Sequence, residues 1–229
     1  VLANLELMAE ELDGEQAETA DAALRSARRM RRLVGDLLLL ARADAKRVQP
    51  RRPTDLADVL MEAVSELAPM ADDHELAVQA QPAVVSGTRD DLHRLVVNLI
   101  ENAVRHTPPG THVRASTATA DGHALVTVQD DGPGIPPDLE ARVFERFVRG
   151  ARDGDGGARG SGLGLAIVRA VAESHGGSVT LARPAGGRGT RFVIRIPADA
   201  RAAGAVDAGD GDHTSTTTGS TIGRRRRRS

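Results

Sequence analysis

The stretch HRLVVNLIENAVRHT, residues 93–107, is too apolar for an exposed helix and too polar for an ordinary buried one. On a helix over about 89–106, apolar side chains would cover most of the circumference and leave one polar stripe. The stripe carries a polar residue at every fourth position: Arg94, Asn98, Asn102 and His106. An amide that is buried without a partner costs about 1–3 kcal/mol, so we expect the stripe to face hydrogen-bond partners or a wet cavity.

Two uses of the paired amides stay open at this point. Amides commonly tie down nearby loop backbone when they are buried. An amide oxygen is also a neutral, hard ligand for Mg²⁺, which prefers oxygen donors and usually brings phosphate groups with it. The asparagine pair therefore needs a second motif before it indicates a function.

An acidic, glycine-rich segment follows a predicted strand. The strand VTVQD ends at Asp130 and continues into DDGPGIP, residues 130–136. A carboxylate at a strand end can accept a hydrogen bond from an exocyclic amine such as that of adenine, and glycines let the backbone approach a flat ring. The same composition is also typical of a simple tight turn.

A second glycine cluster, GARGSGLGLAIVRAV at residues 157–171, runs directly into an apolar helix. Free backbone N–H groups at a helix N-terminus form an anion site, and glycine lets them close around phosphates. The preceding segment RGARDGDGGARG, residues 149–160, has the composition of a linker but lies inside the predicted domain. Long loops in that position are usually functional, so we expect a mobile lid.

The chain divides into three parts around these motifs. Apolar residues at helical spacing over 1–46 predict an antiparallel helical hairpin that is broken at Asp13-Gly14. The hairpin has more apolar surface than it needs for itself, so we expect a second copy to cover it. The alternative is that the hairpin packs on the domain that follows it. The expected parts are a dimerisation hairpin over 1–47, a globular domain over 54–198 and a disordered tail over 199–229.

The middle part alternates between strand and helix patterns after a linker marked by Pro50 and Pro53. The expected helices are 55–71, 89–106, 136–147 and 162–175; the expected strands are 75–80, 83–87, two runs joined by an Asp121-Gly122 turn, 178–183 and 190–196. The predicted fold class is α+β. A helical hairpin, half of a four-helix dimer bundle, would be followed by an α/β sandwich with helices on one face of a mostly antiparallel sheet.

Composition excludes several classes of function. The chain has 229 residues, a formal net charge of −2 and no cysteine, so we expect no disulfide, no thiol chemistry and no nucleic-acid partner. Its longest apolar runs are far shorter than the roughly 20 residues of a membrane span. Because the chain starts at Val1 and shows no leader segment, we expect it to be a piece of a longer protein.

Five motifs follow one another in a specific order: NLIENAVRHT, DDGPGI, FERFVR, GSGLGLAI and GRGT. This order and wording resembles the ATP-binding catalytic domain of sensor histidine kinases, with its asparagine box, glycine boxes and phenylalanine box. The resemblance covers about 55–197, and with the hairpin it reaches about 1–197. It implies the sandwich fold that these kinases share with gyrase, mismatch-repair and chaperone ATPases.

The resemblance also implies a site for ATP and Mg²⁺. Asn102 would be the Mg²⁺ ligand with Asn98 beside it at the phosphates, and Asp130 would bind adenine. The other residues that the resemblance assigns to the nucleotide are Arg105, His106, Gly132, Gly134, Gly160, Ser161, Gly162, Leu163, Gly164 and Thr190, with Arg149 as a candidate phosphate contact at the lid edge. In the family's pattern Phe144 and Phe147 anchor the lid, and we expect both to pack in the core.

Two features depart from the family's pattern. Asp131 stands where the family commonly has Asn. The phosphoacceptor box, a helix with His-Glu-Leu, is also missing: His74-Glu75-Leu76 lies in a strand-like segment inside the ATP domain. We therefore expect neither His74 nor another histidine of the chain to be the acceptor, and we place the acceptor upstream of Val1.

The predicted function is that of an ATP-dependent protein histidine kinase of a two-component system, with a response regulator as partner. The alternative is a hydrolytic ATPase of the gyrase, mismatch-repair or chaperone type, but those enzymes have a general-base Glu where this chain has Asn98. A serine kinase of the anti-sigma type would lack the hairpin, and a binding module without catalysis is the fourth possibility. We further expect a homodimer through the hairpin and a cytoplasmic location, with the plasma membrane reached only through segments outside this chain.

Overall fold

The structure is a computed structural model that describes residues 14–45, 49–148, 161–184, 187–200 and 220–221. The chain forms two compact units, Val1–Ala45 and Lys46–Ser229. The described part of the first unit is helical, and the second unit combines a mixed sheet with helices.

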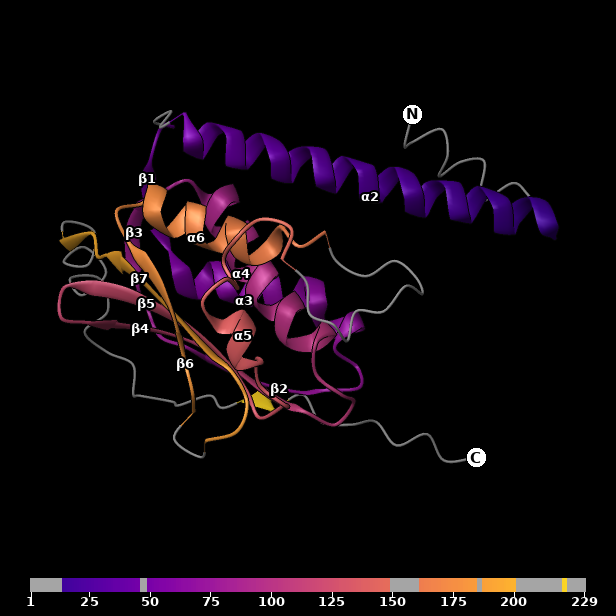
Figure 1. The fold of residues 1–229 in the computed structure, drawn as a ribbon. Helices are drawn as coiled ribbons and strands as arrows, with labels where there is room; N and C mark the ends of the chain where they lie inside the picture. Colours follow the sequence, from indigo (N-terminus) through magenta and orange to yellow (C-terminus); the bar gives the residue numbers. More distant parts are fainter. Residues whose placement is uncertain (1–13, 46–48, 149–160, 185–186, 201–219, 222–229) are drawn as a thin grey trace. The chain divides into compact units, whose positions relative to one another are not determined.

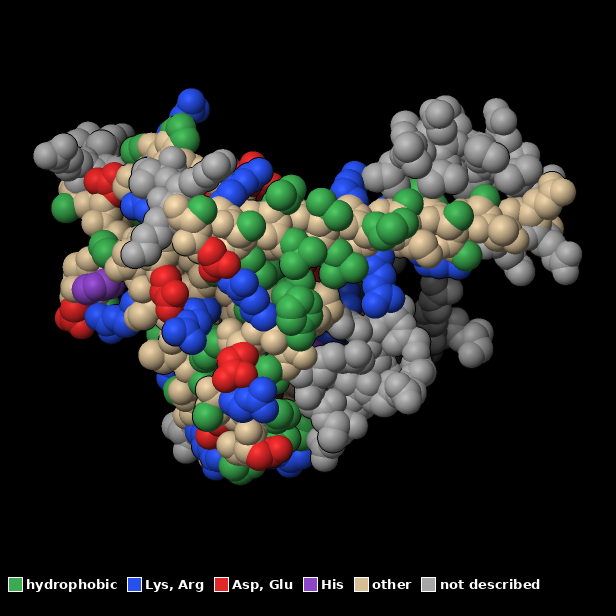
Figure 2. Space-filling model, turned by 45° about the horizontal axis from the view of Figure 1, so that its top comes forward, with side chains coloured by type: hydrophobic (Ala, Val, Ile, Leu, Met, Phe, Trp, Pro, Cys, Tyr) green, Lys and Arg blue, Asp and Glu red, His purple; other side chains and the backbone are tan. Residues whose placement is uncertain are grey.

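One long helix, α2 (Glu15–Asp44), makes up the described part of the first unit. It begins after Gly14, whose φ of 63° lies in the left-handed region that favours glycine, in agreement with the predicted break. Apolar side chains form a strip along α2 (Figure 2), and the most exposed of them, at 49–61%, are Met30, Val34, Leu37 and Leu38. The other helix of the predicted hairpin lies outside the described residues.

The second unit is a two-layer sandwich in which helices lie on one face of a six-stranded sheet (Figure 1). The strand order is β6-β7-β5-β4-β2-β8, and β1 and β3 form a separate pair. The helical elements are α3 (Leu56–Leu67), η1 (Ala68–Met70), α4 (Arg89–Arg105), α5 (Pro137–Glu140) and α6 (Gly164–Ser174). The strands are β1 (Arg52–Asp55), β2 (Glu75–Ala80), β3 (Val84–Gly87), β4 (His112–Ala120), β5 (His123–Asp130), β6 (Ser178–Ala182), β7 (Arg191–Pro197) and β8 (Ser220–Thr221). The predicted α/β sandwich is confirmed.

The central hairpin of the sheet is formed by β4 and β5. It turns at Asp121 and Gly122, whose φ values of 51° and 70° are those of the tight turn that the Asp-Gly pair predicts. The pairing places Asp130, the last residue of β5, opposite Val113. Only β2 and β4 run parallel among the described strands of this sheet, so the sheet is mostly antiparallel, as predicted.

The core lies between the sheet and the helices that cover it. Along β5 every second side chain is buried, as its alternating sequence predicts. The helix α4 contacts both α3 and α6 as well as the sheet, so most of its circumference is covered. Leu95, Leu99 and Ile100 are each at most 1% exposed. The helix predicted from residues 93–107 is therefore the central helix of the sandwich.

The predicted helix over 136–147 is wrong beyond its first turn. Only α5 is helical, and the residues that follow it form turns up to 147. Phe147 has a φ of 64°, which no right-handed helix accommodates, and its N–H donates to the backbone oxygen of Gly162 at 2.8 Å. The backbone of this segment pairs with the second glycine box instead of continuing a helix.

The globular unit extends further at both ends than the sequence predicts. Pro53 lies in β1 and not in a linker, because β1 pairs antiparallel with β3. At the other end the N–H of Asp199 donates to the oxygen of Val84 at 2.8 Å, and Ser220–Thr221 pair with β2. The prediction of disorder over 199–229 is thus wrong for these three tail residues, and most of the remaining tail lies outside the described residues.

Candidate functional site

The two asparagines of α4 lie on successive turns near the C-terminal end of the helix. Asn98 is 7% exposed, and its Nδ2 donates to the backbone oxygen of Arg94 at 2.8 Å. Its Oδ1 lies 3.0 Å from the position that a Cβ atom would take on Gly164. Asn102 is partly exposed, and its side chain has no hydrogen bond within the described part of the chain. Asn98 is therefore held by the helix, whereas the Asn102 amide remains available to a ligand.

Asp130 closes β5 with a carboxylate that is held by backbone groups. The residue is 5% exposed, and its Oδ1 accepts hydrogen bonds from the N–H groups of Gly132 at 3.0 Å and Thr190 at 3.2 Å. Burial raises the pKa of Asp130 above its ordinary value, and the hydrogen bonds from Gly132 and Thr190 act against this. The charge of Asp131 raises the pKa further. Because both backbone donors use Oδ1, Oδ2 keeps acceptor capacity for a ligand.

Three glycines allow the loops around Asp130 to pack closely. A Cβ atom on Gly189 would lie 2.0 Å from the backbone oxygen of Asp130, and one on Gly132 would lie 2.6 Å from Cγ2 of Thr107. Gly134 has a φ of 77°, and its Cβ would come within 3.2 Å of the Gly189 oxygen. Side chains at these positions would push the loops apart, so the geometry around the carboxylate depends on the glycines.

The second glycine box leads into α6. Gly162 has a φ of 69°, and the Oγ of Ser161 accepts a hydrogen bond from the N–H of Leu163 at 3.3 Å. The Leu163 side chain is 1% exposed and anchors the start of the helix in the core. The first N–H groups of α6 have no acceptor within the helix. Because Gly164 has no side chain, the start of α6 can lie next to Asn98. This arrangement suits an anion.

The basic residues that follow Asn102 lie at the surface. Arg105 and His106 are exposed, and the Arg105 guanidinium lies 3.4 Å from Oε1 of Glu101. An exposed ion pair of this kind is weak, so Arg105 can exchange Glu101 for another anion at little cost. Arg149, Gly160 and the predicted lid lie outside the described residues, and their roles stay predictions.

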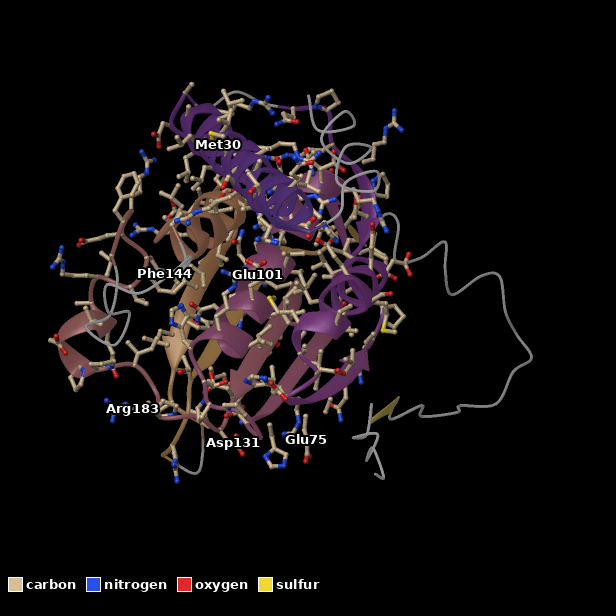
Figure 3. The ribbon with its side chains drawn as sticks, turned by 90° about the vertical axis from the view of Figure 1, so that its right-hand side faces the viewer. Met30, Glu75, Glu101, Asp131, Phe144 and Arg183 are labelled. Carbon is tan, nitrogen blue, oxygen red and sulfur yellow. The ribbon has the colours of Figure 1, made fainter. Side chains whose placement is uncertain are left out.

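Asp131, the residue after Asp130 in the glycine-rich segment, is paired with a histidine. Its Oδ1 accepts the backbone N–H of His112 at 2.9 Å, and its Oδ2 lies 2.8 Å from Nδ1 of the same residue. Nε2 of His112 lies 3.0 Å from Oε2 of Glu75, and Figure 3 shows Asp131 and Glu75 at the same end of the sheet. Burial acts to raise the pKa of Asp131, but the hydrogen bonds and charge of His112 outweigh it and lower the pKa.

Phe144 and Phe147 have different surroundings. The ring of Phe144 packs edge-on against Phe192 of β7, with 6.0 Å between the ring centroids and 75° between the ring planes. Phe147 is 64% exposed, so the prediction that it packs in the core is wrong. Its left-handed backbone allows the hydrogen bond to Gly162, and the ring is left at the surface.

Two residues have roles that the sequence motifs do not indicate. Gly189 approaches the main chain of Asp130, and the only signal for it is its place in the GRGT motif. His175 is 5% exposed and accepts a hydrogen bond from the backbone N–H of Thr88. The only sequence feature that marks His175 is the pair of glycines that follows it. In neither case does the sequence indicate which distant residue is the partner.

His74 lies in the turn before β2 and not on a helix, as predicted. Its Nε2 lies 3.0 Å from Oγ1 of Thr107, and that hydroxyl donates to the backbone oxygen of Ala103 at 2.7 Å. Since the hydroxyl has one hydrogen, Nε2 of His74 must be the donor in the first of these bonds. The ring is thus part of the fold beside the glycine loop.

The described ranges contain neither a cluster of metal-binding side chains nor a membrane-spanning helix. No group of three or more His, Asp or Glu side chains there could hold a metal ion by itself. A cation near Asn102 would therefore depend on oxygens of a bound ligand. None of the helices in the same ranges is both long and apolar enough to span a membrane.

Two protein families match the chain. Residues 87–200 match the histidine kinase-, DNA gyrase B- and HSP90-like ATPases, and residues 1–46 match the His kinase A (phospho-acceptor) domain. The first match includes Asn98, Asn102 and Asp130, and the second coincides with the predicted dimerisation hairpin.

Individual relatives support the same assignment. The chain is 43% identical over 173 residues to the probable sensor histidine kinase TcrY of Mycobacterium tuberculosis, a match that covers 75% of this chain and 36% of TcrY. The solved structure of the mycobacterial sensor histidine kinase MprB has a TM-score of 0.56 and 38% identity, and the match covers 65% of this chain and 97% of that chain. Full-length ShkA in complex with AMPPNP has a TM-score of 0.70 and 29% identity, with 86% of this chain and 42% of that chain covered. The chain spans about a third of the length of the curated relatives it matches.

Proposed function

This chain belongs to the sensor histidine kinase family, and on that premise we propose that its second unit binds ATP and Mg²⁺ for phosphorylation of a histidine in a two-component system. The observation that carries the proposal is the carboxylate of Asp130, which is buried, fixed through Oδ1 and left with acceptor capacity on Oδ2. One acceptor among closely packed glycine loops suits the flat ring and the exocyclic amine of adenine.

The phosphate groups would lie between α4 and the start of α6. The N–H groups at the start of α6 favour anionic oxygens, and Gly164 lets them approach Asn98. The Asn102 amide oxygen would hold Mg²⁺ together with phosphate oxygens, which suits its lack of a partner in the described part of the chain. Bound Mg²⁺ neutralises charge at the phosphates, while the chain's own residues supply position. Arg105 and His106, both exposed, are the proposed contacts to phosphate oxygens, with Arg149 at the lid edge.

The hydrolytic ATPase alternative is less well supported. Such an enzyme needs a base that takes a proton from the attacking water. At the corresponding position this chain has Asn98, a neutral amide whose Nδ2 is already committed to the backbone of Arg94. We therefore propose slow hydrolysis by this chain and transfer to an imidazole as the main reaction.

The activity of the whole protein would involve residues and partners outside this chain. We propose that the γ-phosphoryl group passes to a histidine upstream of Val1 and then to an aspartate of a response regulator. The exposed apolar strip on α2 supports a homodimer through residues 1–47. The chain would lie in the cytoplasm, with membrane anchoring supplied by other segments of the protein.

Calorimetric titration of the full chain with ATP and with GTP, both with Mg²⁺, tests the nucleotide assignment. GTP presents a carbonyl oxygen where adenine has its exocyclic amine, so we expect it to bind at least about tenfold more weakly. Asp130→Ala should weaken ATP and remove the discrimination between the two nucleotides. Equal affinities of the wild-type chain for ATP and GTP would overturn the role of Asp130.

The same protein, incubated with γ-labelled ATP, separates the kinase from the ATPase. We expect neither acid-labile label on the chain nor rapid release of phosphate, because the acceptor histidine and a general base are both missing from the proposed site. A label that disappears in His74→Gln would instead make His74 the acceptor. Rapid release of phosphate would favour the hydrolytic alternative.

A further inference from the structure

His175, at the end of α6, joins two helices through a buried ring with both nitrogens bonded. Nδ1 lies 2.8 Å from the backbone oxygen of Val171, and Nε2 lies 3.1 Å from the backbone nitrogen of Thr88. A carbonyl oxygen can only accept and a backbone N–H can only donate, so Nδ1 carries the hydrogen and Nε2 is the acceptor. These partners assign the neutral Nδ1–H tautomer to the ring.

The surroundings of the ring keep it uncharged. Burial lowers the pKa of His175 most, the hydrogen bond to Val171 opposes this, and the charge of Arg51 lowers the pKa further. Arg51 comes just before β1, and its guanidinium donates to the backbone oxygen of Ser174. Asp91, in the first turn of α4, acts in the opposite direction, and its effect is the smallest of the four.

A glycine makes room for the contact. A Cβ atom on Gly87 would lie 3.0 Å from Cδ2 and 3.1 Å from Nε2 of His175, and 2.6 Å from a methyl group of Leu92. The last residue of β3 must therefore lack a side chain for the ring to reach Thr88. The contact thus involves β3, the residue before α4 and the end of α6.

The helix that His175 holds is the one that carries the asparagines. Thr88 immediately precedes α4, and no side chain caps the start of that helix. Ten residues further along α4, or about 15 Å, Asn98 meets Gly164 at the start of α6. The two helices therefore approach closely near both ends of α6, and at the His175 end a hydrogen bond joins them.

We propose that His175 is a positioning residue of the nucleotide site, whose neutral ring fixes α4 against α6 so that Asn98 and Asn102 stay aligned with the start of α6. This inference rests on the proposed function, because the alignment matters only if phosphates and Mg²⁺ bind there. Protonation of Nε2 would replace the acceptor with a donor facing the N–H of Thr88. The contact then opens as the pH falls, and ATP affinity falls with it.

Two substitutions separate this role from general packing. In His175→Asn the side-chain amide can donate to Val171 but is too short to reach Thr88; in His175→Gln the longer side chain can accept from Thr88 through Oε1. At pH 7.5 we expect ATP affinity with Mg²⁺ to fall about fivefold to tenfold in His175→Asn, the effect of one lost hydrogen bond, and to stay near the wild-type value in His175→Gln.

The pH dependence of ATP affinity is a second test of the positioning role. Because the pKa of His175 is lowered, the unfolded chain takes up this proton at a higher pH than the folded chain. The stability from the contact is therefore complete above the ordinary histidine pKa of 6.5 and is lost as the pH falls below it. We expect ATP affinity of the wild-type chain to decline as the pH falls through the lowered pKa, and we expect His175→Gln to lack this part of the decline.

Amide hydrogen exchange at Thr88, measured without nucleotide, distinguishes the possible failures. Faster exchange in His175→Asn than in His175→Gln supports the contact, and equal rates in the two variants overturn it. If the wild-type chain binds ATP and His175→Asn binds it equally well with an unchanged pH profile, the positioning role is wrong. If both variants lose affinity equally, His175 acts only through packing and the inference is also wrong. If the wild-type chain binds no ATP, the proposed function fails and the positioning role fails with it, while the exchange rates still report whether the contact exists.

Discussion

The two ends of the proposed nucleotide site are built in different ways. At the base end, which comprises Asp130, Gly132, Gly189 and Thr190, backbone groups hold the carboxylate and glycines allow the main chains to touch. At the phosphate end, which comprises Asn98, Asn102 and Gly164, side chains of one helix supply the polar groups, and the Asn102 amide has no partner in the described part of the chain. The base end is thus formed by the fold itself, whereas the proposed phosphate end would be completed by its ligands.

Because of this difference, substitutions at the two ends should have different effects on the free energy of unfolding and on ATP affinity. A substitution at the base end changes contacts that exist without nucleotide, so it should alter the free energy of unfolding as well as ATP affinity. A substitution at Asn102 removes a group that nothing in the described chain uses, so it should alter affinity alone.

The largest effect is expected for Gly189→Ala. The new Cβ would lie 2.0 Å from the backbone oxygen of Asp130 at a φ of 91°, so the free energy of unfolding should fall by at least about 3 kcal/mol and ATP binding should be lost. Gly187→Ala is the matched control: its φ of 71° is also left-handed, but no atom lies within 4 Å of its Cβ, so it should cost only about 1 kcal/mol. Urea unfolding measures both. Similar losses in the two variants would mean that backbone strain, and not the contact with Asp130, decides the result.

A smaller effect, confined to affinity, is expected for Asn102→Ala. ATP affinity with Mg²⁺ should fall by about tenfold, because a direct metal ligand is lost. In EDTA the variant and the wild type should bind ATP equally, and the free energy of unfolding should change by less than about 0.5 kcal/mol. Asn102→Asp keeps a hard oxygen ligand and should recover part of the Mg²⁺-dependent affinity. The assignment fails if Asn102→Ala weakens ATP by the same factor with and without Mg²⁺.

The smallest effect is expected for Asp131→Asn. The pair with His112 is more than half exposed on both sides, so its loss should cost no more than about 1 kcal/mol. The charge of Asp131 raises the pKa of Asp130, so its removal should lower that pKa. Adenine binding requires the ionised carboxylate, and the loss of ATP affinity on acidification should therefore occur at a lower pH in Asp131→Asn than in the wild type.

Calorimetry over a pH series in both proteins measures this shift, and the protonation of ATP itself is common to the two titrations. Glu75→Gln is the control, because it removes the other carboxylate beside His112 without changing the loop. A shift as large in Glu75→Gln as in Asp131→Asn would show that the effect is not specific to the neighbour of Asp130.

Local sequence patterns predict the elements that carry the site. The helix expected over 89–106 is observed as Arg89–Arg105, and the Asp121-Gly122 hairpin is observed with the expected turn. A long helix with a clear apolar period, or a two-residue turn that needs positive φ values, depends on interactions between near neighbours in the chain. The same reasoning failed over 136–147, where the backbone of Phe147 pairs with Gly162, fifteen residues later.

Near neighbours in the chain are enough to predict which chemical groups lie on which element: two amides on one face of a helix, a carboxylate at a strand end and glycines before a second helix. Which distant groups meet depends on how these elements pack together. Gly189 approaches the main chain of Asp130, His175 accepts from Thr88, and Asp131, just after β5, pairs with His112 at the start of β4. The physical reason is that sheet register and helix packing are set by the burial of the whole core, so local patterns do not encode the partners that they bring together.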